Sequence, residues 1–203
     1  AMQLTHPGIA RLYNFESTEG ENFLVMEYVS GVSLDRIIAE RGRLTLAEML
    51  RIAKPLADAI DYAHTQNVLH RDIKPANIIV QLAEGGAADL QINAVKMLDF
   101  GIACMMHETA RLFTGKTDIG TLPYMSAEQV RGDVLSPRSD VYAFAATLYE
   151  CLCGHPPFYS GDVGWQIINK DPPEIDGLPP DVNLHLLRAL SRDPNRRPGS
   201  CAQ

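Results

Sequence analysis

The feature that most constrains this 203-residue chain is a polar run, HRDIKPAN at 70–77, set between apolar segments. The segment Val68–Val80 predicts short strands on either side of a polar loop. Val95–Leu98 predicts another strand, and Asp99 follows it directly. The chain must therefore fold so that charged and amide side chains stand in a loop and at a strand end.

The residue types in this loop suit phosphoryl transfer. The carboxylate of Asp72 can accept a proton from an attacking hydroxyl, and the ammonium of Lys74 can stabilise negative charge. The amide oxygen of Asn77 and the carboxylate of Asp99 are hard ligands suited to magnesium. Taken singly, each short motif is more often an ordinary surface turn. Together they fit a reaction in which positioning and charge neutralisation dominate.

The order of the expected elements indicates an α+β fold that is mainly helical. Thr45 and Glu48 have the spacing of a capping box at the start of the clearest helix, and Ser33 can cap a shorter one. The expected elements are hairpin strands over 8–15 and 22–28, and helices over 33–40, 45–64, 141–153 and 183–191.

Charge and cysteine content exclude several classes of function. The formal net charge is −7 and there is no long basic run, so neither nucleic acid nor an anionic membrane is a favoured partner. No apolar run has the length of a membrane span. The four cysteines form neither a disulfide framework nor a zinc pattern, which favours a cytoplasmic setting. The cytosolic part of a larger membrane protein is the alternative.

Four segments resemble, in this order, the signature motifs of eukaryotic-like (Hanks-type) protein kinases: HRDIKPAN, LDFG, GTLPYMSAE and SDVYAFAATLYECLCGHPPF. Lys74, where tyrosine kinases commonly have arginine or alanine, favours a serine/threonine kinase, and the wording resembles bacterial members. The resemblance covers nearly the whole chain. It implies a remnant β-hairpin of the small, N-terminal lobe over 1–28, and the large, C-terminal lobe over 29–203 with its final helix incomplete.

By that resemblance, Asp72 orients and deprotonates the substrate hydroxyl, and Lys74 contacts the transferred phosphoryl group. Asn77 and Asp99 are implied to hold Mg²⁺ between the phosphates of ATP, with Mn²⁺ as an alternative metal. Thr121 is implied to hydrogen-bond toward Asp72 and Lys74, and to help select the serine or threonine hydroxyl of a protein substrate.

The resemblance also places the adenine of ATP against residues 26–29. Met26 is implied to be the gatekeeper, and the backbone groups of Glu27 and Val29 to hydrogen-bond the base. Leu34 and Ile79 would form the apolar floor and its support. An ordinary amphipathic strand is the alternative interpretation of this segment.

One arginine in the motif indicates regulation. Arg71 resembles the arginine that pairs with a phosphate on the activation loop, so control by phosphorylation is expected. The candidate phosphosites are Thr117 and, as alternatives, Thr114 and Thr109. Threonines that merely populate a solvated loop are the simpler explanation.

Other residues are implied to support the site from behind. Glu128 is expected to meet Arg197 in a buried ion pair. Asp140 is expected to accept hydrogen bonds from backbone amides of the catalytic loop. His70 and Phe100 resemble members of the stacked apolar column found in active kinases.

Three parts of the family pattern are missing from the sequence: a glycine-rich GxGxxG segment, a VAIK-type lysine, and the glutamate-bearing helix that pairs with it. We therefore expect the chain to be truncated relative to a whole kinase domain, and to bind ATP weakly on its own. The alternatives are a pseudokinase-like binding or regulatory module, and one half of a split or domain-exchanged kinase. Apolar surface from Ile9 to Val25 would favour a homodimer or a complementing N-terminal lobe.

Overall fold

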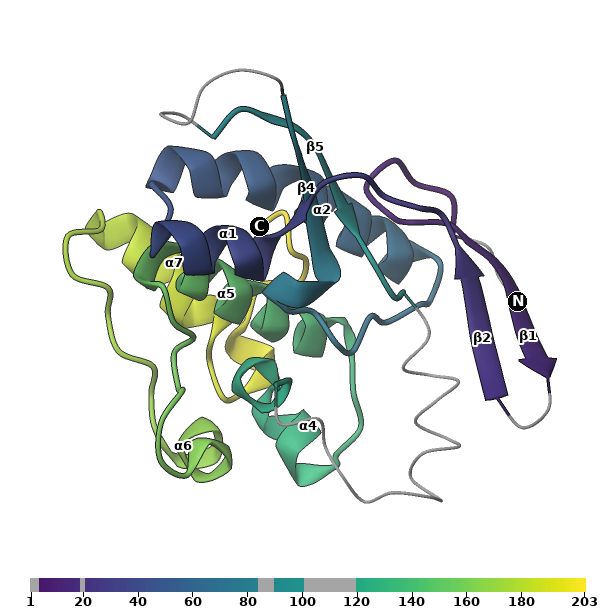
Figure 1. The fold of residues 1–203 in the computed structure, drawn as a ribbon. Helices are drawn as coiled ribbons and strands as arrows, with labels where there is room; N and C mark the ends of the chain where they lie inside the picture. The colour runs from purple at the N-terminus through teal and green to yellow at the C-terminus, as the bar shows by residue number, and fades with distance from the viewer. Residues whose placement is uncertain (1–3, 19–20, 84–89, 101–119) are drawn as a thin grey trace.

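The computed structural model describes residues 4–18, 21–83, 90–100 and 120–203 (Figure 1). Within these ranges the chain forms six α-helices and two small antiparallel sheets, so the predicted α+β, mainly helical fold is confirmed. The strands are β1 (Leu12–Thr18), β2 (Glu21–Met26), β3 (Val32–Ser33), β4 (Ile78–Leu82) and β5 (Ile92–Met97). The helices are α1 (Leu34–Arg41), α2 (Leu46–Thr65), α4 (Ala127–Arg131), α5 (Pro137–Cys153), α6 (Val163–Asn169) and α7 (Pro180–Ala189). Three short 3₁₀ turns are η1 (Pro75–Asn77), η2 (Leu122–Tyr124) and η3 (Pro194–Arg196).

Helices α2 and α5 form the centre of the body (Figure 1). Twelve of the seventeen residues of α5 are buried, because its apolar side chains surround the whole helix. Helix α2 is amphipathic instead, and its apolar face contacts α5 and β5. It opens with the predicted capping box of Thr45 and Glu48 and continues through Pro55 to Thr65. None of the described helices is long and apolar enough to cross a membrane.

The small sheet β3-β4-β5 lies against this body and carries the polar loop at its end. Strand β4 pairs with β5 so that Ile78 faces Met97, the last residue of β5. The N-terminal segment joins the same edge, because Met97 donates to the carbonyl of Gly8 and accepts from the amide of Ala10. The residues just outside this pairing, Asn77 and Leu98, are joined by a hydrogen bond of 2.8 Å. The two strands therefore deliver residues 77 and 99 to the same end of the sheet.

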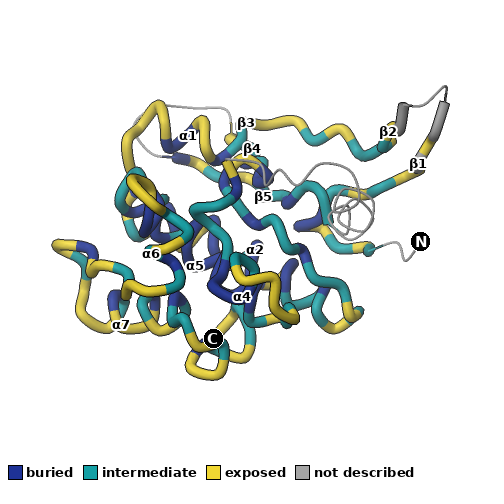
Figure 2. The backbone as a smooth tube through the Cα atoms, turned by 90° about the horizontal axis from the view of Figure 1, so that it is seen from below, coloured by how far each residue is buried: buried dark blue, intermediate teal, exposed yellow. Residues whose placement is uncertain are grey.

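The hairpin β1–β2 projects from the body as a separate two-stranded sheet (Figures 1 and 2). Strands β1 and β2 pair antiparallel, so the expected hairpin is confirmed. Phe23 and Val25 are 49% and 40% exposed, and Tyr13 is 57% exposed. Isolated two-stranded hairpins are marginally stable in water, so this element is one that a neighbouring surface would stabilise.

Two helices begin earlier than their apolar patterns predicted. Helix α5 starts at Pro137 and not at 141, and α7 starts at Pro180 and not at 183. Proline suits the first helical position, where no intrahelical amide hydrogen bond is needed. Ser33 does precede α1, but its side chain makes no capping hydrogen bond. Its backbone pairs with Ile79 in the sheet instead.

Candidate active site

The polar loop of residues 70–77 is anchored by Asp140, in the first turn of α5. One carboxylate oxygen of Asp140 accepts from the backbone amide of His70 at 2.8 Å, and the other accepts from that of Arg71 at 2.9 Å. The imidazole Nε2 of His64, at the end of α2, also lies 2.8 Å from Asp140. Because Asp140 is 1% exposed and α5 is buried on most sides, the loop is tied to a rigid part of the fold.

His70 is fully buried and links the loop to the strand that precedes Asp99. Its Nδ1 accepts from the amide of Asp72 at 3.3 Å, and its Nε2 lies 2.9 Å from the carbonyl of Leu98. A neutral imidazole with its proton on Nε2 satisfies both contacts. Burial lowers the pKa of His70, which favours that neutral form. The ring of Phe100 packs edge-on against His70, with centroids 4.5 Å apart.

Two polar side chains, Asn77 and Lys74, contact Asp72, and a third, Thr121, contacts Lys74. The amide of Asn77 donates to Oδ2 of Asp72 at 2.9 Å, and also to its backbone carbonyl at 2.8 Å. The ammonium of Lys74 lies 3.1 Å from the same Oδ2 and donates to the hydroxyl of Thr121 at 2.7 Å. Among the described residues, Oδ1 of Asp72 is buried and has no hydrogen-bond partner. One oxygen is thus held in place, while the other makes no hydrogen bond with the described residues.

Asp99 stands beside this group with the chemistry of a metal ligand. Burial, aided by the negative charge of Asp72, raises the pKa of Asp99. A divalent cation would offset the negative charges of the Asp72 and Asp99 carboxylates. The amide nitrogen of Asn77 is turned to Asp72, and its oxygen accepts no hydrogen bond from the described residues. Asp99 and Asn77 fit Mg²⁺, which takes one or two protein ligands together with phosphates and water. The described residues contain no cluster of three His, Cys, Asp or Glu that could hold a metal by itself.

The segment expected to meet adenine runs from the end of β2. The amide of Glu27 donates to the carbonyl of Arg11 at 2.8 Å, and its carboxylate is bonded by Lys96 and by the amide of Arg11. The bond from Lys96 is the main cause that lowers the pKa of Glu27. The carbonyl of Glu27 and the amide of Val29 have no partner among the described residues. Met26 pairs with Leu12 and is partly buried.

The segment beyond Val29 packs directly on β4. Leu34 is 0% exposed at the start of α1, and Ile79 is partly buried in β4. Gly31, three residues before Leu34, has a φ of +149°. A Cβ at Gly31 would stand 2.6 Å from the carbonyl oxygen of Val80 and 2.7 Å from the side chain of Ile79. Only glycine allows this close approach, which sets the height of the segment above Ile79.

A buried ion pair braces the far side of the loop. Arg197 donates to both carboxylate oxygens of Glu128, at 2.6 and 2.8 Å. One residue further along α4, the side chain of Gln129 donates to the carbonyl of Arg71 at 2.9 Å. Residues 127–131 are thereby tied both to Arg197 and to the polar loop of residues 70–77. Among the described residues the Nε of Arg71 is buried without a partner.

The structure brings most of the expected site residues together, and adds some that the sequence analysis missed. Thr109, Thr114 and Thr117 lie outside the described residues. The missed contributors are His64, Gln129 and Gly31. Gln129 had a local signal, because Ser126 and Gln129 have capping-box spacing and form one.

Comparison with known proteins agrees with this geometry, since residues 1–203 match the protein kinase domain. The chain belongs to the protein kinase family. It is 35% identical to the serine/threonine-protein kinase PknB of Mycobacterium tuberculosis (strain ATCC 25618 / H37Rv) and 33% identical to PknB of Mycobacterium leprae. Each match covers 100% of this chain and 33% of the relative. The serine/threonine-protein kinase pkn3 of Myxococcus xanthus is 35% identical over 98% of this chain and 38% of its own length.

This kinase chain thus spans about a third of the length of the curated relatives that it matches. The relatives named above are all bacterial serine/threonine-protein kinases, which supports kinship with the bacterial Hanks-type enzymes. Protein kinases in general use ATP and a divalent metal.

Proposed function

We propose that this chain is part of a kinase that transfers the γ-phosphate of ATP to serine or threonine hydroxyls of a protein substrate, and that the 203-residue chain alone is weakly active or inactive. The observation that carries the proposal is the state of Asp72. Its Oδ2 is held by Asn77 and Lys74, whereas Oδ1 has no partner among the described residues. A carboxylate that is fixed through one oxygen and leaves the other without a hydrogen bond can serve as a general base once a substrate hydroxyl reaches it.

The neighbouring residues supply the remaining roles. Oδ1 of Asp72 orients the substrate hydroxyl and takes its proton as the oxygen attacks phosphorus. Lys74, held 2.7 Å from the hydroxyl of Thr121, stabilises the charge of the transferred phosphoryl group. Thr121 would also help to select a hydroxyl-bearing substrate residue.

Asp99 and Asn77 would hold Mg²⁺, which supplies charge neutralisation on the phosphates when it is bound. The carbonyl of Glu27 and the amide of Val29, which have no partner among the described residues, would hydrogen-bond adenine. Met26 would be the gatekeeper, and Ile79 and Leu34 the apolar floor and its support. Asp140, His70 and Phe100 keep the loop in place, and Arg71 would pair with a phosphate on the segment that carries Thr109, Thr114 and Thr117.

A phosphoryl-transfer assay tests this function. We expect Asp72→Asn to lower the rate by about 10²–10⁴-fold, because the base is lost while the shape is kept. Asp58→Asn, an exposed acid on α2, is the matched control and is expected to leave the rate unchanged. The assay uses the full-length gene product and the 203-residue chain in parallel. An Asp72→Asn variant within a few-fold of the unchanged protein would show that Asp72 is not the base.

The exposed hairpin favours a second proposal, that residues 1–28 are strands of a small lobe and residues 29–203 the large lobe. Exposed Tyr13, Phe23 and Val25 would then be covered by further strands, from a complementing N-terminal lobe or from a second copy of the chain. Sedimentation equilibrium, alone and with an added N-terminal lobe, tests it. A cytoplasmic setting fits the free thiols of Cys151, Cys153 and Cys201.

A further inference from the structure

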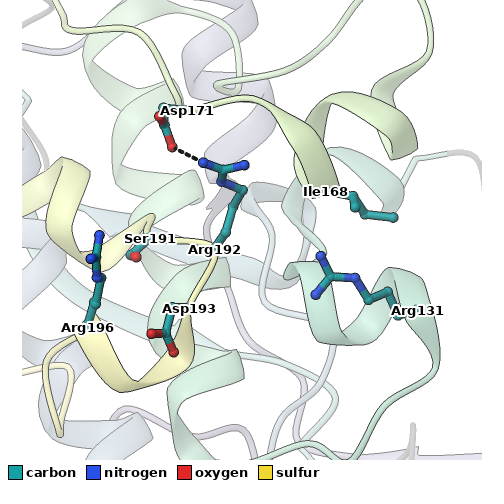
Figure 3. A pocket seen from close by; sticks show the side chains of 7 residues that line it. All are labelled: Arg131, Ile168, Asp171, Ser191, Arg192, Asp193 and Arg196. Atoms are coloured by element: carbon teal, nitrogen blue, oxygen red, sulfur yellow. Dashed lines mark hydrogen bonds and ion pairs between the residues drawn. The ribbon is translucent and has the colours of Figure 1, made fainter.

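A second polar pocket lies on the helical body, lined by residues from three separate elements (Figure 3). Its volume is about 340 Å³, and none of the residues proposed for catalysis or nucleotide binding lines it. Arg131 comes from the end of α4, Arg192 from the segment after α7, and Arg196 from η3. In the view of Figure 3, Arg131 and Arg196 stand on opposite sides of Arg192. The formal net charge of the chain is −7, so three arginines around one pocket are a local reversal of its charge.

The three guanidinium groups differ in how far they are already paired. Arg192 donates to the carboxylate of Asp171 at 2.9 Å and to the carbonyl of Asn169 at 3.1 Å. By contrast, the guanidinium groups of Arg131 and Arg196 make no hydrogen bond or ion pair with any part of the chain that the structure describes. Arg131 and Arg196 therefore line the pocket without a partner among the described residues, and Arg192 is held in position beside them.

The backbone that carries these arginines is fixed by the buried Arg197. Its guanidinium donates to the carbonyls of Ser191 and Arg192, at 2.7 and 3.2 Å. The same guanidinium is paired with Glu128, three residues before Arg131 in α4. Arg196 is its direct neighbour in the chain. The pocket is thus built on a rigid frame, which lowers the entropic cost of binding a ligand.

We propose that this pocket binds the phosphate monoester of a phosphorylated serine or threonine in a protein. Guanidinium groups match phosphate oxygens with paired hydrogen bonds. Clusters of arginines that are not bonded to other protein groups are the usual recognition element for phosphorylated residues. The absence of a long basic run argues against a nucleic acid as the source of the phosphate. The choice of a phosphorylated protein rests on the proposed kinase function, since that reaction makes such groups. The pocket would then hold a phosphorylated substrate, or a second phosphorylated copy of this chain, apart from the catalytic loop.

Asp193 gives the proposal an internal control. It lines the same pocket, and its carboxylate accepts from the amide of Asn195 at the start of η3. Asparagine can accept the same capping bond without the negative charge. Asp193→Asn should therefore preserve the fold of η3 and strengthen phosphate binding, whereas loss of Arg131 and Arg196 should weaken it.

The test is an NMR titration of the ¹⁵N-labelled chain, because this method detects weak binding. The titration is followed at the arginine Nε–H signals. The probes are the peptide Gly-Gly-phosphoserine-Gly-Gly, the same peptide with plain serine, and inorganic phosphate. We expect the phosphopeptide alone to shift the signals of Arg131 and Arg196 saturably. The double variant Arg131→Gln/Arg196→Gln should raise its Kd at least about tenfold. Arg51→Gln, which removes a charge on α2 outside the pocket, should leave the Kd unchanged.

Equal shifts with the plain serine peptide, or an unchanged Kd in the double variant with an unchanged Tm, would overturn the proposal. Inorganic phosphate binding as tightly as the phosphopeptide would assign the pocket to free phosphate instead. The Asp72→Asn variant separates this result from the proposed catalysis, because it should lose phosphoryl transfer and still bind the phosphopeptide. The double variant Arg131→Gln/Arg196→Gln should lose phosphopeptide binding and still transfer phosphate to a short peptide substrate.

Discussion

The contact whose removal we expect to cost the most free energy of unfolding is the ion pair of Glu128 and Arg197. The two side chains are 7% and 0% exposed. All five N–H groups of Arg197 donate: two to Glu128 and three to backbone carbonyls of residues 138, 191 and 192, at 2.6–3.2 Å. The ring of Tyr142 lies 5.1 Å from the guanidinium carbon. Glu128 also accepts from the hydroxyl of Ser139.

Glu128→Ala would leave the guanidinium charge buried with only neutral partners. Breaking one side of a buried pair in this way costs about 3–5 kcal/mol. In a domain of this size, 1 kcal/mol shifts the Tm by about 2–4 °C, so we expect a fall of roughly 6–20 °C. The control is Glu40→Ala on α1, where Arg36 and Glu40 are 71% and 62% exposed. That exposed pair contributes about 0.3–0.5 kcal/mol.

Urea unfolding followed by far-UV circular dichroism measures both variants, with equal slopes as the condition for comparing them. The double variant Glu128→Ala/Arg197→Met adds a second arm. It should recover part of the lost stability, because an apolar replacement removes the stranded charge. If Glu128→Ala were no more destabilising than Glu40→Ala, the assignment of this pair as a main brace would be wrong.

Three further outcomes follow from the site. Burial works to raise the pKa of Glu128, but the hydrogen bond and charge of Arg197 outweigh it and hold the pKa below its ordinary 4.5. Its stabilising effect is therefore complete above pH 4.5 and lost as the pH falls through the lower folded value, so urea unfolding of Glu128→Gln should show a weaker acid dependence. Asp99→Asn should weaken ATP binding in calorimetry when Mg²⁺ is present and change it little in EDTA. Gly31→Ala should lower the Tm by an amount equivalent to about 1–3 kcal/mol, because its Cβ would collide with the backbone of β4.

Local rules in the sequence predicted the elements whose signals lie within a few residues. The capping box at Thr45 placed the start of α2 correctly, because its hydrogen bonds join residues three apart. The starts of α5 and α7 were missed for a related reason. Their first turns are polar and begin with Pro137 and Pro180, so the apolar period that marked the helix bodies had not yet begun. A search for proline at the first helical position would have found both.

The contacts that shape the site were beyond such rules. His64 and Asp140 are 76 residues apart in the chain, and Lys74 and Thr121 are 47 apart. No periodicity or spacing encodes a hydrogen bond over such a distance. The resemblance to kinases supplied the expectation for Asp140 and Thr121, but it gave no role to His64, Gln129 or Gly31. Those roles depend on how α2, α4 and β4 pack, which only the folded chain shows.

The backbone of the loop explains why so many distant residues are needed. Arg71 and Asp99 adopt left-handed conformations with φ of +69° and +63°, which are uncommon for residues other than glycine. Each such residue costs about 1–3 kcal/mol and persists only where its surroundings hold it. Asp140 holds the first through the amide of Arg71, and the bond from Leu98 to Asn77 holds the strand end before the second.

These conformations place the carboxylates of Asp72 and Asp99 at the same end of the β4–β5 pairing. The repulsion between Asp72 and Asp99 is part of what raises the pKa of Asp99, so the arrangement is unfavourable until a cation offsets it. The buried packing of α2 and α5 offsets the cost of the left-handed backbone at Arg71 and Asp99 and of the repulsion between Asp72 and Asp99. That packing is stable for reasons unrelated to catalysis. A substitution that loosened α5 would therefore be expected to disturb the proposed metal site before it unfolded the chain.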